Sequence, residues 1–112
     1  MEKLSSQKCV PCEVGGDPLK TDEIAQVLPQ LDDLWEVREN KKLERKFKFK
    51  NFVEAMKFVN KVADLAEEQG HHPDFHIHYN KITIELWTHA VGGLSLNDFI
   101  VAAKINKIWQ LS

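Results

Sequence analysis

Histidines are the residues of this chain best suited to chemistry, and all five lie in its second half: His71, His72, His76, His78 and His89. An imidazole accepts or donates a proton near neutral pH, so grouped histidines can carry out acid and base steps without a metal. Three histidines can also hold a zinc ion and leave its fourth position open. Adjacent His71 and His72 would point to opposite faces of an extended chain. A loop before Pro73 would relieve this, so zinc remains an alternative.

A β-hairpin is predicted to position most of these histidines. Residues 75–79 and 82–87 each alternate apolar and polar side chains, which indicates two strands with one buried face. Asn80–Lys81 between them suits a two-residue turn, because asparagine tolerates the positive φ that such a turn requires. With this turn, Tyr79 faces Ile82 across the hairpin.

The same register brings three histidines together. His72 falls directly opposite His89, and His71 lies one step further on. We therefore expect these imidazoles to converge at the open end of the hairpin, beside a Gly-Gly turn and the start of the last helix. Such a cluster is more typical of a functional site than of unrelated surface residues. His76 and His78 fall on the polar face and are predicted to form a solvated or subunit-facing surface.

Several spaced positions resemble a known family. They are Glu67, His71, His72, Pro73, Tyr79, His89 and Asp98, together with the segment WTHAVGGLSLND from Trp87 to Asp98. Their types and intervals resemble the pterin-4a-carbinolamine dehydratases (4a-hydroxytetrahydrobiopterin dehydratases) over about residues 19–109. The resemblance implies dehydration of a 4a-hydroxytetrahydropterin to the quinonoid dihydropterin, without cofactor or metal. It also implies an α+β fold, a homodimer or homotetramer, and a link to an aromatic amino-acid hydroxylase whose pterin is recycled.

Roles for individual residues follow from the same resemblance. His71 and His89 would do the acid and base work, without an assignment of which does which, and His72 would mainly position the pterin. Five further residues would bind substrate or support the site: Glu67, Pro73, Tyr79, Thr88 and Asp98. Asn97 stands where some family members have a basic residue, so any contact made from that position is open.

Three of the supporting residues have alternative interpretations. Glu67 lies in the last turn of a predicted helix, where the helix dipole disfavours a carboxylate, and it would support His71 or His72. Asp98 would orient a histidine or contact substrate, but with Ser95 it could simply cap the last helix. Tyr79 belongs to the core by its pattern, although its hydroxyl could reach the site.

The remaining elements give the order α-β-β-α-β-β-α and a four-stranded antiparallel sheet with helices packed on one face. A short helix from residue 21 is ended near Leu28 by Pro29. Segment 35–50 alternates as a hairpin, and apolar stripes indicate helices over 52–69 and 96–108. Residues 1–20, with their glycines and prolines, are interpreted as a flexible arm before a single domain at 21–112.

Composition limits the classes of function. The 112 residues suit one domain, and a formal charge of −2 creates no strong field for nucleic acid or anionic membranes. No apolar run could span a bilayer and the N-terminus lacks a signal peptide's apolar segment, so we expect a cytoplasmic protein. Cys9 and Cys12 form CVPC, but the glycines and proline that follow favour two reduced thiols over a thioredoxin-like or zinc motif.

Two other functions stay open. The chain could be a non-catalytic dimerisation or binding protein, a role that the resemblance also implies. It could otherwise act as a dehydratase-like protein in another pterin pathway, such as molybdopterin metabolism. The complete histidine set favours catalysis.

Overall fold

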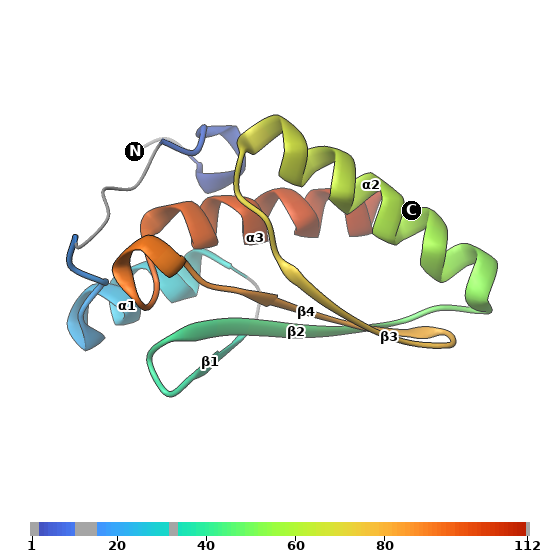
Figure 1. The fold of residues 1–112 in the computed structure, drawn as a ribbon, viewed down its shortest axis with the longest axis horizontal. Helices are drawn as coiled ribbons and strands as arrows, with labels where there is room; N and C mark the ends of the chain where they lie inside the picture. Colours follow the sequence, from blue (N-terminus) through green and yellow to red (C-terminus); the bar gives the residue numbers. More distant parts are fainter. Residues whose placement is uncertain (1–2, 11–15, 32–33, 112) are drawn as a thin grey trace.

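A computed structural model describes residues 3–10, 16–31 and 34–111 of the chain (Figure 1). Within these ranges the main elements are α1 (Thr21–Val27), β1 (Glu36–Arg38), β2 (Lys42–Lys48), α2 (Phe52–Gln69), β3 (Asp74–His78), β4 (Lys81–Leu86) and α3 (Leu96–Gln110). Short 3-10 turns occupy Leu4–Ser6, Leu28–Gln30 and His89–Val91. The order predicted from the sequence is confirmed, and α1 gives way to a 3-10 turn at Leu28–Gln30, which contains Pro29.

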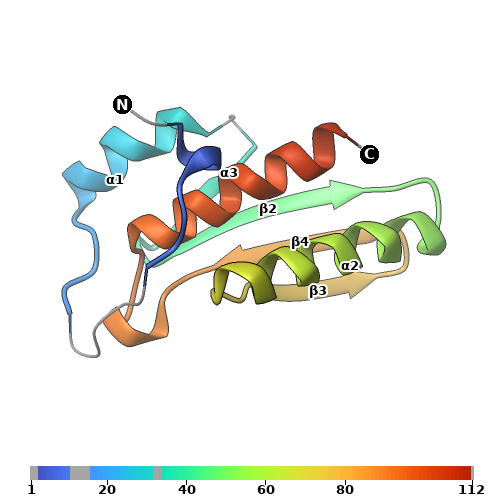
Figure 2. The same ribbon diagram turned by 90° about the horizontal axis from the view of Figure 1, so that it is seen from above.

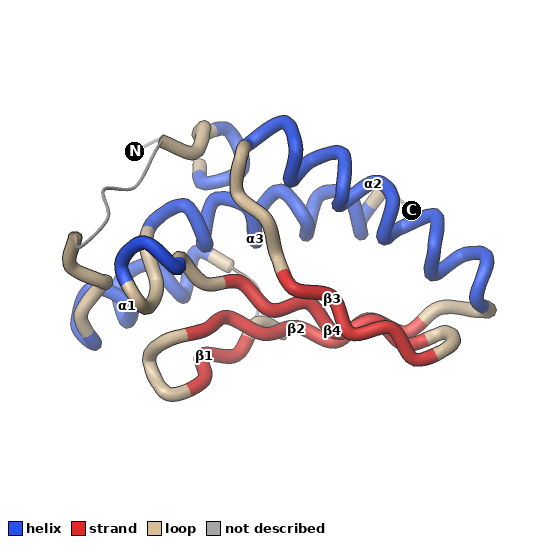
Figure 3. The backbone as a smooth tube through the Cα atoms, viewed as in Figure 1, coloured by secondary structure: helices blue, strands red, loops and turns tan. Residues whose placement is uncertain are grey.

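The four strands form one antiparallel sheet in the order β1-β2-β4-β3. Figure 2 shows α2 and α3 side by side over the sheet, roughly along the strands, and Figure 3 shows both on the same face of the sheet. The covered face carries the buried strand residues Leu43, Phe47, Ile82, Ile84 and Leu86. Because one face is covered, buried and more exposed side chains alternate along β2 and β4. The predicted α+β architecture is confirmed.

Capping residues fix the ends of the two long helices. Asn51 accepts a hydrogen bond from the backbone N–H of Glu54 (3.0 Å) and begins α2, as the sequence predicts. Gly70 ends α2 in the left-handed conformation, with φ of 66°. Ser95 caps α3 in a capping box with Asp98. These two helix ends, the end of α2 and the start of α3, lie next to the predicted histidine cluster.

The β3–β4 hairpin differs from its predicted register by two residues. His78 pairs with Lys81, so the turn is Tyr79–Asn80 and not Asn80–Lys81. The predicted pairing of Tyr79 with Ile82 is therefore wrong. Tyr79 adopts a positive φ of 54° in the turn and is 65% exposed, so its predicted place in the core is wrong as well.

The neighbouring strand explains this turn. The side-chain amide of Asn80 donates to the carbonyl of Phe49 (2.9 Å), and the N–H of Phe49 donates back to the carbonyl of Asn80 (2.8 Å). These two bonds extend the β2–β4 ladder by one residue beyond Lys48. They hold Asn80 next to Phe49, and Tyr79 is the turn residue that adopts the positive φ. A slip of two residues keeps every side chain on its predicted face, whereas a slip of one would exchange the faces.

The described part of the N-terminal segment lies against the helices (Figure 2). Leu4 is 5% exposed and belongs to the hydrophobic core, and the carbonyl of Ser5 accepts a hydrogen bond from Lys104 of α3 (2.9 Å). The division into an arm at 1–20 and a domain at 21–112 stays a prediction. Cys9 is among the described residues of this segment, and Cys12 lies outside them.

None of the helices in the described ranges is long and apolar enough to cross a membrane.

Candidate active site

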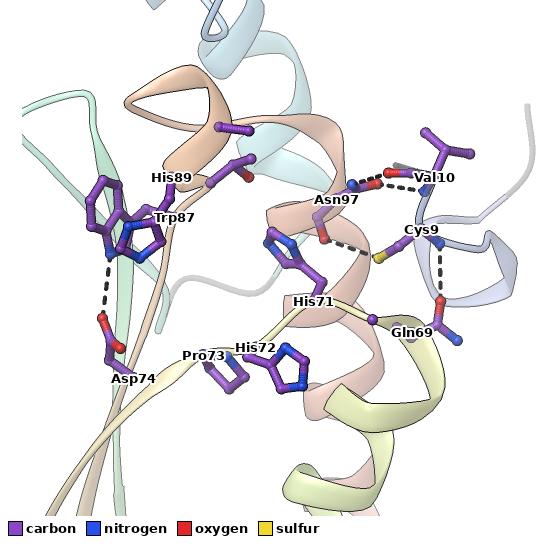
Figure 4. A pocket seen from close by; sticks show the side chains of 13 residues that line it. Cys9, Val10, Gln69, His71, His72, Pro73, Asp74, Trp87, His89 and Asn97 are labelled. Atoms are coloured by element: carbon purple, nitrogen blue, oxygen red, sulfur yellow. Dashed lines mark hydrogen bonds between the residues drawn. The ribbon is translucent and has the colours of Figure 1, made fainter. Parts of the chain in front are cut away.

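A pocket of about 640 Å³ lies at one end of the sheet, where three parts of the chain bring the predicted site residues together (Figure 4). The first is the loop from α2 to β3, which carries His71, His72 and Pro73. The second follows β4 and carries Trp87, Thr88 and His89, and the third is the start of α3. The left-handed Gly70 turns the chain out of α2, so the two adjacent histidines occupy a loop and are not held in an extended strand.

His71 is tied to a fully buried carboxylate. Its Nε2 lies 2.5 Å from Oδ1 of Asp98. The His71 side chain is only 12% exposed, and Asp98 is completely buried. A buried carboxylate needs donors on its oxygens, because an unpaired charge in the interior is costly. The imidazole supplies one such donor, and its orientation is fixed in return.

The other carboxylate oxygen of Asp98 accepts two further hydrogen bonds. They come from the hydroxyl of Thr88 (2.8 Å) and the backbone N–H of Ser95 (2.9 Å). Asp98 therefore performs both roles that the sequence left as alternatives: it completes the cap of α3 and it contacts a histidine. Its three partners belong to the α2–β3 loop, the segment after β4 and the start of α3, so one side chain connects all three parts of the site.

Backbone contacts hold Thr88 in this network. Thr88 and Gly93 form an isolated β-bridge, with Thr88 N–H donating to the carbonyl of Gly93 (2.7 Å). Between them, residues 89–92 form a tight turn that ends with Gly92 in the left-handed conformation. A Cβ atom on Gly93 would lie 2.9 Å from Cβ of Pro18, so the close approach of that segment requires glycine.

His72 also contacts a carboxylate, but at the surface. Its Nε2 lies 2.5 Å from Oε2 of Glu67 in the last turn of α2. The two side chains are 61% and 78% exposed. Of the two histidines that the prediction left open for Glu67, the structure pairs it with His72.

His89 stacks against an aromatic ring on the opposite side of the pocket. Its ring centroid lies 3.7 Å from that of Trp87, with 39° between the planes. The indole N–H of Trp87 donates to Asp74 (3.3 Å), and the ammonium of Lys42 lies 5.4 Å from the indole centroid. His89 is not paired directly with His72, because that expectation rested on the incorrect register. Both nevertheless line the pocket with His71.

Residues 17–108 match the sequence model of the family described as Pterin 4 alpha carbinolamine dehydratase. The chain belongs to this family.

Individual relatives agree with the assignment. A protein of Alkaliphilus metalliredigens is 47% identical over 107 residues, covering 96% of both chains. A protein of Legionella pneumophila is 48% identical over 106 residues, covering 94% of both. Each is named "Putative pterin-4-alpha-carbinolamine dehydratase". A crystal structure from Brucella melitensis, described as a transcriptional coactivator/pterin dehydratase, superposes with a TM-score of 0.76 at 33% identity, covering 82% of this chain and 98% of that one.

The dehydratase-family pocket collects most of the predicted site residues. His71, His72, Pro73, Thr88 and His89 line it, and Asp98 and Glu67 contact two of these histidines. Tyr79 is not brought to the pocket, since β3 separates it from His72. His76 and His78 are exposed on the polar face of the sheet as predicted, with His76 hydrogen-bonded to Glu85. In the described ranges, no group of three or more His, Cys, Asp or Glu side chains is arranged to hold a metal.

One side of the pocket is formed by residues that the sequence pattern did not indicate. Cys9 and Val10 of the N-terminal segment line it, together with Gln69 and Asn97. The only signal was the departure at Asn97 from the basic residue of some family members. Segment 1–20 has no periodicity, and the contacts of Cys9 and Val10 span 60 to 88 residues in sequence. Local pattern analysis does not detect such contacts.

Proposed function

We propose that this protein dehydrates a 4a-hydroxytetrahydropterin to the quinonoid dihydropterin by histidine acid–base catalysis, and so supports tetrahydropterin recycling after aromatic amino-acid hydroxylation. Family membership supports the substrate class. The observation that carries the mechanism is the contact between His71 and the buried Asp98 at the pocket. The pocket volume of about 640 Å³ suits one bicyclic ligand, because small-molecule sites commonly measure about 300–1,000 Å³.

The reaction requires two proton transfers. The C4a–O bond breaks with its electron pair going to oxygen, and a proton delivered to that oxygen makes it leave as water. Loss of the proton from the adjacent ring nitrogen allows a C4a–N double bond to form. One group must therefore donate a proton while another accepts one. Each turnover leaves the acid one proton short and the base with one extra proton. Exchange with solvent restores both groups.

We assign the base to His71. In the neutral ring, Nε2 carries the proton that it donates to Asp98, so Nδ1 is the nitrogen left to accept a proton from the substrate. When Nδ1 becomes protonated, the buried carboxylate stabilises the imidazolium that forms. Thr88 and Ser95 donate to the other carboxylate oxygen and hold Asp98 in place for this role.

We assign the acid to His89. Its ring stacks on the face of Trp87, and this contact holds the imidazole at the pocket. His89 is exposed at the pocket, so it can recover its proton from solvent after each turnover. The exposed His72–Glu67 pair would then position the pterin, since the catalytic protons need no further donor.

The proposal is tested by following the decay of carbinolamine generated in situ by a tetrahydropterin-dependent hydroxylase. The uncatalysed reaction in water must be subtracted. We expect His71→Ala and His89→Ala each to lower kcat by about 10²–10⁴-fold, the usual contribution of an acid or base group. A chelator should leave the wild-type rate unchanged, because the proposed mechanism uses no metal.

His76→Ala and His78→Ala are the matched controls, because both remove histidines from the exposed face of the sheet. They should retain the wild-type rate. If both pocket variants changed kcat by less than about threefold, well under the expected acid–base contribution, the catalytic assignment would be wrong. If wild-type protein gave no rate above background, the alternative of a non-catalytic binding protein would gain support. The Brucella relative's description, which includes coactivation, favours the same alternative.

A further inference from the structure

We propose that Cys9 and Val10 of the N-terminal segment form a substrate-contacting wall of the pocket, held in place by Asn97 and Gln69. We call these two residues the N-terminal wall. The inference rests on the proposed function for the identity of the ligand, a pterin. It assigns substrate binding to a segment that sequence patterns indicate only as a loosely attached arm.

The strongest contact of the N-terminal wall is a reciprocal pair of hydrogen bonds. The backbone N–H of Val10 donates to Oδ1 of Asn97 (3.1 Å), and Nδ2 of Asn97 donates to the carbonyl of Val10 (2.6 Å). Asn97 is 5% exposed and lies in the first turn of α3, directly before Asp98. Its side-chain amide therefore binds the main chain of Val10 as a neighbouring strand would. A basic residue at this position could not return both bonds, because it offers donors only.

Cys9 is held by the other helix of the site. Its backbone N–H donates to Oε1 of Gln69, the last residue of α2 (3.0 Å), and its thiol approaches the carbonyl of Asn97 at 3.7 Å. Further back, Leu4 is buried in the core. The segment is thus anchored in the core at one end and at both helix termini at the other. Adjacent anchors of this kind fix Cys9 and Val10 relative to His71, which follows Gln69 by two residues.

The position of the N-terminal wall indicates what it does. Figure 4 shows Cys9 and Val10 on one side of the pocket, with Trp87 and His89 on the other and His71 and His72 between. Val10 is 66% exposed. A ligand that fills the pocket would cover the apolar side chain of Val10 on one side. On the opposite side it would meet the aromatic ring of Trp87. A flat heteroaromatic ring such as a pterin fits between two such surfaces.

Protection of a thiol tests this contact directly. The chain has two cysteines, so Cys12→Ser leaves Cys9 as the only thiol. Alkylation of Cys9 by iodoacetamide would be timed with and without 7,8-dihydrobiopterin, with adenosine as a control ligand. At about ten times its Kd, the dihydropterin should slow alkylation by about tenfold, since only the unliganded fraction reacts. Dihydropterin that binds, by calorimetry, without slowing alkylation would overturn the proposal.

Kinetics of Asn97→Ala test the support of the N-terminal wall. This variant removes both hydrogen bonds to Val10 and touches neither His71 nor His89. We expect KM to rise about tenfold with kcat within about twofold, the pattern of a lost binding contact. Asn60→Ala, on the exposed surface of α2, is the matched control and should leave both constants unchanged. A fall in kcat with KM unchanged would contradict a wall that only binds substrate.

The outcomes separate this inference from the proposed function. If wild-type protein dehydrates carbinolamine but shows neither thiol protection nor a KM effect, the N-terminal wall is rejected and the dehydratase remains. If wild-type protein does not dehydrate carbinolamine but dihydrobiopterin protects Cys9, the dehydratase function is rejected and the binding wall remains. The protection experiment keeps Asn97 intact, so it gives an answer even if Asn97→Ala does not fold.

Discussion

Adjacent histidines of this site make the same contact in opposite surroundings. His71 and His72 each place Nε2 at 2.5 Å from a carboxylate oxygen, of Asp98 and Glu67 respectively. The first pair is 12% and 0% exposed, whereas the second is 61% and 78% exposed. Distance alone therefore does not distinguish the two pairs, and burial does.

The difference in burial changes what each contact can do. Water and salt screen the exposed His72–Glu67 pair, and such surface pairs typically contribute about 0–1 kcal/mol. The buried Asp98 is screened far less, and each of its hydrogen bonds offsets a large desolvation cost. Asp98 consequently holds the His71 ring in position, and in the proposed mechanism it also determines which ring nitrogen carries the proton. Glu67 leaves His72 free to adjust to a ligand, which suits a positioning residue.

The largest effect that should separate the pairs is that of Asp98→Asn. The amide oxygen can still accept from Thr88 and Ser95, but its NH2 group then faces Nε2 of His71. That arrangement favours the tautomer with the proton on Nδ1 and removes the proposed base. We expect kcat to fall by about 10²–10⁴-fold with little change in KM, as when the orienting aspartate of a catalytic triad is replaced.

Asp64→Asn, on an exposed position of α2, makes the same substitution away from the site and should retain full activity. Circular dichroism and thermal unfolding would establish that Asp98→Asn is folded. If folded Asp98→Asn kept more than about a third of the wild-type kcat, the buried carboxylate would have only a structural role, because lost acid–base function costs far more.

Asp98 also illustrates how much of the site the sequence could predict. The spacing of Ser95 and Asp98 indicates a helix cap, and the cap is present. The same spacing cannot reveal that the second carboxylate oxygen contacts His71, because that contact joins residues 27 apart. A capping pattern is local, whereas the contact of the cap residue with His71 depends on how α2 and α3 pack.

The hairpin shows why fold prediction succeeded while the pairing of residues did not. Alternation of apolar residues fixes which side chains face the core, and this survives a slip of two residues. The turn was decided by the bonds of Asn80 to Phe49, which belongs to another part of the chain. Sequence rules would not assign a positive φ to Tyr79, because a bulky side chain disfavours it.

Polar residues inside the core were beyond pattern analysis as well. Arg45 lies on the apolar face of β2, is 3% exposed and donates to Asn106 (2.5 Å). Its guanidinium also lies 4.5 Å from the ring centroid of Phe47. A strand rich in lysine and arginine indicates a solvent-exposed face. Arg45 can be buried because Asn106 of α3 accepts its hydrogen bond, and this partner becomes apparent only when the helix is packed on the sheet.

An intermediate effect on stability and activity is expected for Thr88→Val, which removes the hydroxyl that donates to Asp98 of the buried His71–Asp98 pair. Thr88 is 5% exposed, and Asp98 would keep the donor from Ser95. We expect the free energy of unfolding to fall by about 1–2 kcal/mol. Since His71 would be held less firmly, we expect kcat to fall about three- to tenfold, a fraction of a full acid–base contribution. Urea unfolding and the dehydration assay measure the two effects.

Thr83→Val is the control for this variant, because Thr83 lies on the outer face of β4, where valine is a good strand residue. It should leave the activity unchanged and should not destabilise the protein. Equal stability of wild type and Thr88→Val would show that the hydroxyl of Thr88 adds nothing to the carboxylate network.

The smallest effect is expected for Glu67→Gln, the exposed counterpart of Asp98→Asn. The amide oxygen can still accept from His72, and the lost charge is largely screened by water. We expect the free energy of unfolding to stay within about 0.5 kcal/mol of wild type. We also expect kcat/KM to stay within about threefold, with any difference shrinking at about 1 M salt, where charges interact over only about 3 Å.

Glu68→Gln, one residue along the same exposed turn, provides the baseline. If Glu67→Gln lost as much kcat/KM as Asp98→Asn, burial would not explain the different roles of the two histidines. His72 would then be the candidate for the base.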